Sequence, residues 1–159
     1  MIKLLVMDID GTLTDGKLYI GNDGEIMKVF SIKDGSVIKY ILTIYKIIPI
    51  ILTARESTIL ERRCRELNVT NIHQNCKNKK ERLQQIALSN GLIANSEGIY
   101  EDIAYIGDDI ADLEAMKICG LKGCPLDAID SIKHISNFVS SKNGGEGAVR
   151  EFIEWVCKK

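Results

Sequence analysis

The sequence shows no marked excess of charge, no long apolar run and no leader-like start. Its 159 residues carry a formal net charge of −1, and a nucleic-acid-binding surface is not expected because it would need a clustered basic excess. The longest apolar candidate, Ile41 to Leu52, is interrupted by Lys46 and Pro49 and is too short to cross a membrane. An apolar segment begins almost directly after Met1, so we expect no signal peptide.

The sequence also has no C-x-x-C cysteine pair and few histidines. The five cysteines form no C-x-x-C pair and only two histidines are present, so we expect no zinc site. Unpaired cysteines favour reduced thiols and a cytoplasmic protein. The whole sequence is 45% hydrophobic and 27% charged, which is typical of a soluble globular protein. The length predicts one domain over residues 1–159.

A short apolar segment near the amino terminus ends in two carboxylates. The segment from Leu4 to Met7 has the continuous apolar character of a buried strand in a parallel sheet, and Asp8 and Asp10 follow it. Ligands bind beyond the carboxyl ends of such strands, so we expect both acids in one crevice. A simple polar turn at Asp10 and Gly11 is the alternative interpretation.

Strand-like and helix-like segments alternate along the rest of the chain. We expect strands over residues 48–52, 69–73, 103–106, 119–123 and 138–139, and helices over 36–46, 57–67, 78–90 and 148–158, with two more beginning after 112 and at 125. This alternation predicts right-handed crossovers and an α/β fold with a mostly parallel sheet. Residues 17–30 predict a projecting β-hairpin, which is marginal alone and is expected to pack against another subunit.

Polar side chains follow several of the expected strands, where a sheet has no need of them. They are Asp8 and Asp10, Thr53 with Arg55, Lys79 or Lys80, and Asp108, Asp109 and Asp112. Carboxylates from two strands repel each other without a cation, and hard oxygen ligands suit Mg²⁺. Together with a hydroxyl and an ammonium, Mg²⁺ would hold a phosphoryl group. Asp8 would then attack phosphorus while Asp10 moves the protons.

Four segments resemble, in order, the signatures of the haloacid dehalogenase superfamily. They are Asp8 to Gly16, Leu52-Thr53, Lys79 and Gly107 to Asp112. The hairpin, the small size and the segment Gly144 to Glu151 are similar to the capless subfamily typified by 3-deoxy-D-manno-octulosonate 8-phosphate phosphatases. This resemblance implies a three-layer αβα, Rossmann-like fold in which the hairpin replaces a cap domain. It also implies a homotetramer with active sites at subunit interfaces.

The resemblance assigns roles to the matching acids. It makes Asp8 the nucleophile and Asp10 the general acid and base. Mg²⁺ would be held by Asp8, the backbone carbonyl of Asp10, and Asp108. Asp109 and Asp112 would support that site from nearby, although Asp109 could equally be only a helix N-cap.

The resemblance assigns roles to cationic and hydroxyl groups as well. Thr53 and Lys79 would bind the transferring phosphoryl group, and Lys79 fits the family spacing better than Lys80. Arg55 and Arg63 would recognise the sugar acid, with Arg63 reaching from a neighbouring subunit. The arginines around Arg63 could instead form a solvated helix face.

The resulting hypothesis is an enzyme, a Mg²⁺-dependent phosphoric monoester hydrolase for 3-deoxy-D-manno-octulosonate 8-phosphate. A nonulosonate 9-phosphate (of KDN or an N-acylneuraminate) is the alternative substrate, because the distinction depends mainly on Arg55. Two competing hypotheses are a silent oligomerisation module, related to the C-terminal domain of acylneuraminate cytidylyltransferases, and a receiver-type signalling domain. The chain departs from the family pattern at Ala54 and in lacking a longer C-terminal tail.

Overall fold

The computed structural model describes all 159 residues and centres on a six-stranded sheet. The strand order is β5-β4-β1-β6-β7-β8, and every neighbouring pair is parallel. The strands are β1 (Leu4–Met7), β4 (Ile48–Leu52), β5 (Asn71–His73), β6 (Tyr100–Ile106), β7 (Cys119–Cys124) and β8 (Phe138–Val139). The expected α/β fold with a parallel central sheet is confirmed.

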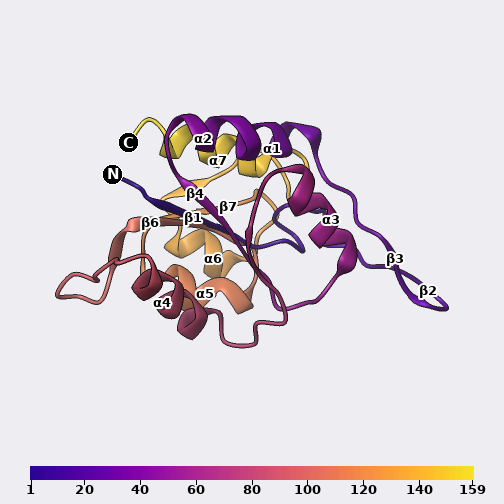
Figure 1. Cartoon of the computed structure of the whole chain (residues 1–159), viewed down its shortest axis with the longest axis horizontal. Helices are drawn as coiled ribbons and strands as arrows, with labels where there is room; N and C mark the ends of the chain where they lie inside the picture. Colours follow the sequence, from indigo (N-terminus) through magenta and orange to yellow (C-terminus); the bar gives the residue numbers. More distant parts are fainter.

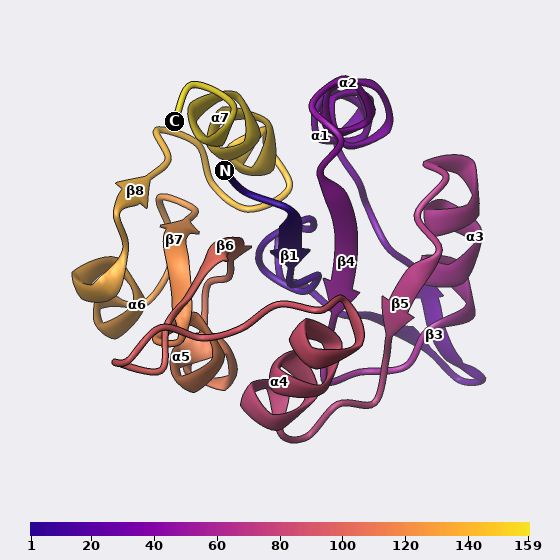
Figure 2. The same cartoon turned by 60° about the vertical axis from the view of Figure 1, so that its left-hand side comes forward.

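Helices cover both faces of this sheet (Figures 1 and 2). One face carries α1 (Ile32–Ser36), a π-helical turn (Val37–Ile41), α2 (Leu42–Ile44), α3 (Thr58–Glu66) and α7 (Ala148–Val156). The other face carries α4 (Lys79–Ser89), α5 (Ile110–Met116) and α6 (Asp130–Ile135). The molecule therefore has the three layers that the resemblance implied.

Strand β1 lies between β4 and β6 and contributes to the core on both sides. Leu4 and Val6 belong to the apolar cluster under α4, α5 and α6, whereas Leu5 and Met7 belong to the cluster under α1, α2, α3 and α7. Successive side chains of a strand point to opposite faces, so a strand covered on both faces must be apolar throughout. The strand is thus fixed from both sides, and the residue that follows it emerges at the middle of the sheet edge.

The hairpin formed by β2 (Tyr19–Gly21) and β3 (Gly24–Met27) is a separate two-stranded antiparallel sheet. It projects away from the three layers (Figure 1). Large apolar side chains are exposed on and around it, namely those of Leu18, Ile20, Ile26, Met27 and Val29. The expected hairpin is confirmed, with paired strands shorter than the range 17–30.

The helix expected from Ser36 begins earlier, at Ile32. Its N-cap is Ser31, whose hydroxyl accepts hydrogen bonds from two backbone N–H groups of the first turn. Gly35 lies inside this helix rather than in a turn before it. The Arg63 side chain occupies the space that a Cβ would need there, so a larger residue would not fit.

The helix expected from Pro125 begins later, at Asp130. Residues 125–128 form a turn closed by a hydrogen bond from the Ala128 N–H to the Pro125 carbonyl. None of the helices combines the length and the apolar character that membrane crossing requires.

Candidate active site

Three neighbouring strands end at the same edge of the sheet, and a polar residue follows each of them. Asp8 follows β1, Thr53 follows β4, and Asp108 follows β6 after one glycine. Because β1 pairs in parallel with both neighbours, the three ends lie side by side. The chain leaves β1 toward β4 and later returns on its other side at β6, which is the point where ligands bind in open α/β sheets.

The ammonium of Lys79 joins two buried carboxylates beneath this edge. Its Nζ lies 2.5 Å from Asp8 Oδ1 and 2.7 Å from Asp112 Oδ1, and the three side chains are between 1% and 8% exposed. The hydroxyl of Tyr105 donates to the same Asp112 oxygen at 2.8 Å. Although burial opposes it, the two carboxylates raise the pKa of Lys79, so the lysine stays charged.

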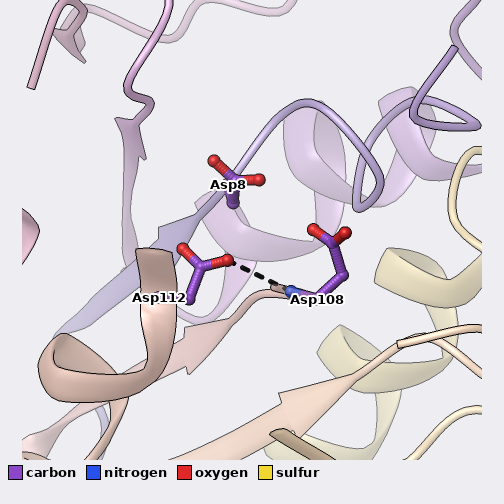
Figure 3. A group of neighbouring side chains, drawn as sticks. All are labelled: Asp8, Asp108 and Asp112. Atoms are coloured by element: carbon purple, nitrogen blue, oxygen red, sulfur yellow. Dashed lines mark hydrogen bonds between the residues drawn. The ribbon is translucent and has the colours of Figure 1, made fainter. Parts of the chain in front are cut away.

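Asp8 and Asp108 carry more negative charge than this single lysine offsets. One carboxylate oxygen from each of Asp8, Asp108 and Asp112 lies within 4.8 Å of the others (Figure 3). Burial, followed by Asp112, raises the pKa of Asp8. Burial also raises the pKa of Asp108 to about 6; its carboxylate forms no ion pair and accepts only a 2.9 Å hydrogen bond from Thr12. Two hard oxygen donors in such surroundings fit a divalent cation such as Mg²⁺.

Asp112 itself has no coordination capacity to spare. Its Oδ1 accepts from Lys79 and Tyr105, and its Oδ2 accepts from the backbone N–H groups of Asp108 and Asp109 at 3.2 and 3.4 Å. The carboxylate therefore holds Lys79 and the start of α5 in place. Asp109 is exposed and is the N-cap of α5, which is the simpler of its two sequence-based interpretations.

A second group of charges surrounds Asp10, two residues beyond Asp8. Lys28 Nζ lies 2.5 Å from Asp10 Oδ1, and Arg55 Nε lies 3.7 Å from Asp10 Oδ2. Thr53, which is 2% exposed, accepts a 3.4 Å hydrogen bond from the Arg55 N–H through its hydroxyl. The structure thus brings Arg55 to Asp10 and keeps the Thr53 hydroxyl at the end of β4.

Lys28 and Tyr105 were not anticipated from the sequence. Tyr105 lies in an apolar strand, where a buried hydroxyl requires a partner, and this requirement is the one signal that could have indicated it. The alternating pattern predicts Lys28 in the second strand of the hairpin, whereas β3 ends one residue earlier, at Met27, and the pattern does not indicate that the Lys28 side chain returns to Asp10.

Arg63 lies apart from both charge groups within one chain. Its guanidinium stacks 5.8 Å from the centre of the Phe30 ring, and its Nη1 contacts Glu66 at 3.2 Å. The role expected for Arg63 concerned the site of a neighbouring subunit and stays a prediction.

The glycine-rich segment 143–147 packs directly on the loop that follows β1. The Gly145 N–H donates to the Thr12 carbonyl at 3.1 Å, and the Gly144 N–H donates to Asp127 at 2.9 Å. A Cβ at Gly144 would overlap the carbonyl of Gly11. Glycine is therefore required for this contact, which supports the Asp8 to Asp10 loop from the side of α7.

Comparison with known proteins adds to this geometry. No family model matches the chain. The 3-deoxy-D-manno-octulosonate 8-phosphate phosphatase of Escherichia coli K12 is 36% identical over 157 residues, covering 96% of this chain and 78% of the relative. Its counterpart from Yersinia pestis is 34% identical over 155 residues, covering 98% and 79%.

Solved structures show the same similarity over nearly the whole chain. The cobalt-bound phosphatase of this kind from Haemophilus influenzae superposes with a TM-score of 0.89 at 33% identity, covering 99% of this chain and 88% of the other. The Moraxella catarrhalis enzyme, in complex with magnesium ion, phosphate ion and KDO, superposes with a TM-score of 0.90 at 33% identity, covering 99% and 86%.

Proposed function

We propose that this protein is a Mg²⁺-dependent phosphatase for 3-deoxy-D-manno-octulosonate 8-phosphate. The chain belongs to the family of phosphatases for this sugar-acid phosphate, within the haloacid dehalogenase superfamily. The observation that carries the proposal is the arrangement at the edge of β1 and β6. There Lys79 binds Asp8 at 2.5 Å, while the Asp108 carboxylate lies alongside and forms no ion pair with a side chain. A nucleophilic carboxylate, a fixed ammonium and a cation site are what phosphoryl transfer requires.

In the proposed reaction Asp8 and Asp10 divide the chemistry. An oxygen of Asp8 attacks phosphorus, the bond from phosphorus to the sugar oxygen breaks, and Asp10 gives its proton to that oxygen. Asp10 then takes a proton from water as the water attacks phosphorus, and the bond from phosphorus to Asp8 breaks. Phosphate leaves, and both acids return to their starting states.

Other residues of the chain bind and orient the phosphoryl group. Lys79 and Thr53 reach the site from α4 and β4 and would contact phosphoryl oxygens. The cation would be held by Asp8, the backbone carbonyl of Asp10, and Asp108. When bound, Mg²⁺ neutralises charge on the phosphoryl oxygens.

Substrate choice and assembly are the finer parts of the proposal. Arg55 lies beside Asp10 with a 44% exposed side chain, so its planar fork is available for the carboxylate of a sugar acid. The exposed apolar side chains of the hairpin would be covered in a homotetramer, with Arg63 serving a neighbour's site. We place the protein in the cytoplasm as a single domain, in keeping with its five free cysteines.

The test is phosphate release from 3-deoxy-D-manno-octulosonate 8-phosphate and from a nonulosonate 9-phosphate. We expect preference for the former, and loss of activity both with EDTA and in Asp8→Asn, with recovery on adding Mg²⁺ to the EDTA-treated wild type. Asp102→Asn, which removes an exposed ion pair with Lys3, is the matched control and should stay active. Turnover that persists in EDTA and in Asp8→Asn contradicts the proposal, whereas preference for the nonulosonate overturns only the substrate assignment.

The assembly is tested separately by light scattering of the purified protein. We expect the mass of four chains at working concentration, and a purely monomeric active enzyme would contradict the tetramer.

A further inference from the structure

Lys28 is an unusual lysine, because its charged end is buried although it leaves from an exposed hairpin. Its side chain is 3% exposed, whereas the neighbouring residues Met27 and Val29 are exposed. Burial of an ammonium is costly unless it is paired, so the contacts of Lys28 must compensate for this cost.

Two carboxylates provide that compensation. Lys28 Nζ lies 2.5 Å from Asp10 Oδ1 and 3.0 Å from Glu25 Oε1, and these acids are 18% and 16% exposed. Without the lysine, only the more distant guanidinium of Arg55, 3.7 Å from Asp10, would offset the repulsion between the two acids. Lys28 is therefore the cation that contacts both Asp10 and Glu25 directly.

The second carboxylate oxygens of Glu25 and Asp10 differ in their contacts. Glu25 Oε2 accepts a hydrogen bond from the hydroxyl of Ser57, the N-cap of α3, so Glu25 and Lys28 are tied to the body of the molecule. Asp10 Oδ2 accepts no hydrogen bond, and Arg55 Nε lies 3.7 Å from it, beyond hydrogen-bond distance. Asp10 is thus hydrogen-bonded through Oδ1, whereas Oδ2 has only the longer ion pair with Arg55.

We infer that Lys28 is a positioning residue for Asp10, holding Oδ1 so that Oδ2 is the oxygen that exchanges the proton with the leaving group and with water. The inference rests on the proposed role of Asp10 as acid and base. Since Glu25 lies on β3 and Lys28 directly follows β3, the placement of the hairpin determines the placement of Asp10. The hairpin then contributes to the chemistry of its own chain, besides any contact with another subunit.

The test compares Lys28→Met with Lys28→Arg and with Lys3→Met, a control that removes a 2.7 Å ion pair distant from the site. Supporting residues of this kind typically contribute about 10- to 100-fold in activity. We expect Lys28→Met to lower kcat on the sugar-acid phosphate by that amount while KM changes by less than about threefold, as for an interaction used mainly in the transition state. Lys28→Arg should retain a higher kcat than Lys28→Met, and Lys3→Met should behave as wild type.

A second readout separates positioning from a loss of folded protein. With para-nitrophenyl phosphate the leaving group needs no proton from Asp10, so transfer to Asp8 should stay fast in Lys28→Met while attack by water slows. A burst of nitrophenol approaching the enzyme concentration is then expected before a slow steady state. A partly unfolded enzyme would instead lose burst and steady-state rate in proportion.

The possible outcomes distinguish this inference from the proposed function. If the wild type hydrolyses the substrate and Lys28→Met matches it in kcat and shows no burst, the inference is overturned while the function stands. If Lys28→Met loses rate without a burst and Lys28→Arg is no better, a structural role replaces the positioning role. If the wild type has no Mg²⁺-dependent activity, the proposed function fails first.

Discussion

Two Asp–Lys pairs of the same length, 2.5 Å, lie two residues apart at the end of β1, yet they are built differently. Lys79 meets Asp8 from the start of α4 and is enclosed with Asp112 under the sheet edge. Lys28 meets Asp10 from a hairpin that lies outside the three layers (Figure 1). The first pair depends only on packed core elements, whereas the second depends on how the hairpin is held.

This difference corresponds to the two proposed roles, phosphoryl transfer at Asp8 and proton transfer at Asp10. The phosphoryl-transfer group around Asp8 is complete within one chain and buried. The proposed proton-transfer and recognition group around Asp10 is mostly buried, but it includes Arg55, whose side chain is 44% exposed. We infer that the fold fixes the reaction through the first group, and that substrate and assembly act through the second.

The largest expected effect comes from breaking the buried pair. Lys79→Met would leave the carboxylates of Asp8 and Asp112 buried without a cation, and removing one partner of a buried pair typically costs about 3–5 kcal/mol. We expect this loss of unfolding free energy in urea denaturation, together with no measurable phosphatase activity.

Lys80→Met is the matched control, because Lys80 lies in the same helical turn and forms no ion pair. It should leave both stability and activity close to wild type. Equal effects at both positions would mean that the first turn of α4, and not the Lys79 ammonium, is what matters.

Metal binding should stabilise the Asp8 group in a pH-dependent way. The pKa of Asp108 is about 6 in the folded protein, against an ordinary value of 3.8. The folded state therefore binds more protons, and the metal-free protein loses stability as the pH rises from about 4 to about 6. Mg²⁺ competes with these protons, so it should stabilise the protein more at pH 7 than at pH 5.

At 100 times its Kd a ligand stabilises by about 2.7 kcal/mol, which corresponds to a Tm rise of roughly 5–10 °C for a chain of this size. Calorimetry with and without Mg²⁺ at pH 5 and pH 7 measures this rise in Tm. Asp108→Asn should abolish the gain. A gain that is equal at both pH values would place the metal away from Asp108.

The smallest expected effect is on substrate recognition by the Asp10 group. Arg55→Ala removes an exposed guanidinium and should raise KM for the sugar-acid phosphate about 10-fold, as for loss of one charge-assisted contact. KM for para-nitrophenyl phosphate, which has no sugar carboxylate, should stay nearly unchanged. Arg62→Ala, with an 83% exposed side chain on α3, is the control. An equal rise in KM for both substrates would assign Arg55 to the phosphoryl group.

The sequence predicted the parts of this site that follow from local patterns. The apolar run before Asp8 indicated a buried strand, and the alternation of elements indicated that β1, β4 and β6 end at one edge. Asn78 indicated the start of α4, and the Asn78 side chain caps this helix in the structure. That helix start places Lys79, rather than Lys80, under Asp8.

Contacts that depend on the path of a loop could not be predicted. Asp10 and Lys28 meet because of the angle at which the hairpin leaves the sheet, and alternation along a strand does not specify that angle. The early start of α1 could not be predicted either, because Asp34-Gly35 indicates a turn by local propensity. In the structure the Ser31 N-cap starts the helix before these residues, and Arg63 packs over Gly35.

The most direct test of the division between the two groups is the intact mass of Asp10→Asn after acid quenching in the presence of Mg²⁺ and para-nitrophenyl phosphate. We predict a chain that carries one phosphoryl group on Asp8, because transfer proceeds without a proton from residue 10 while hydrolysis does not. The double variant Asp8→Asn/Asp10→Asn should carry none. Turnover of Asp10→Asn at the wild-type rate, or a phosphoryl group on another residue, would contradict the account.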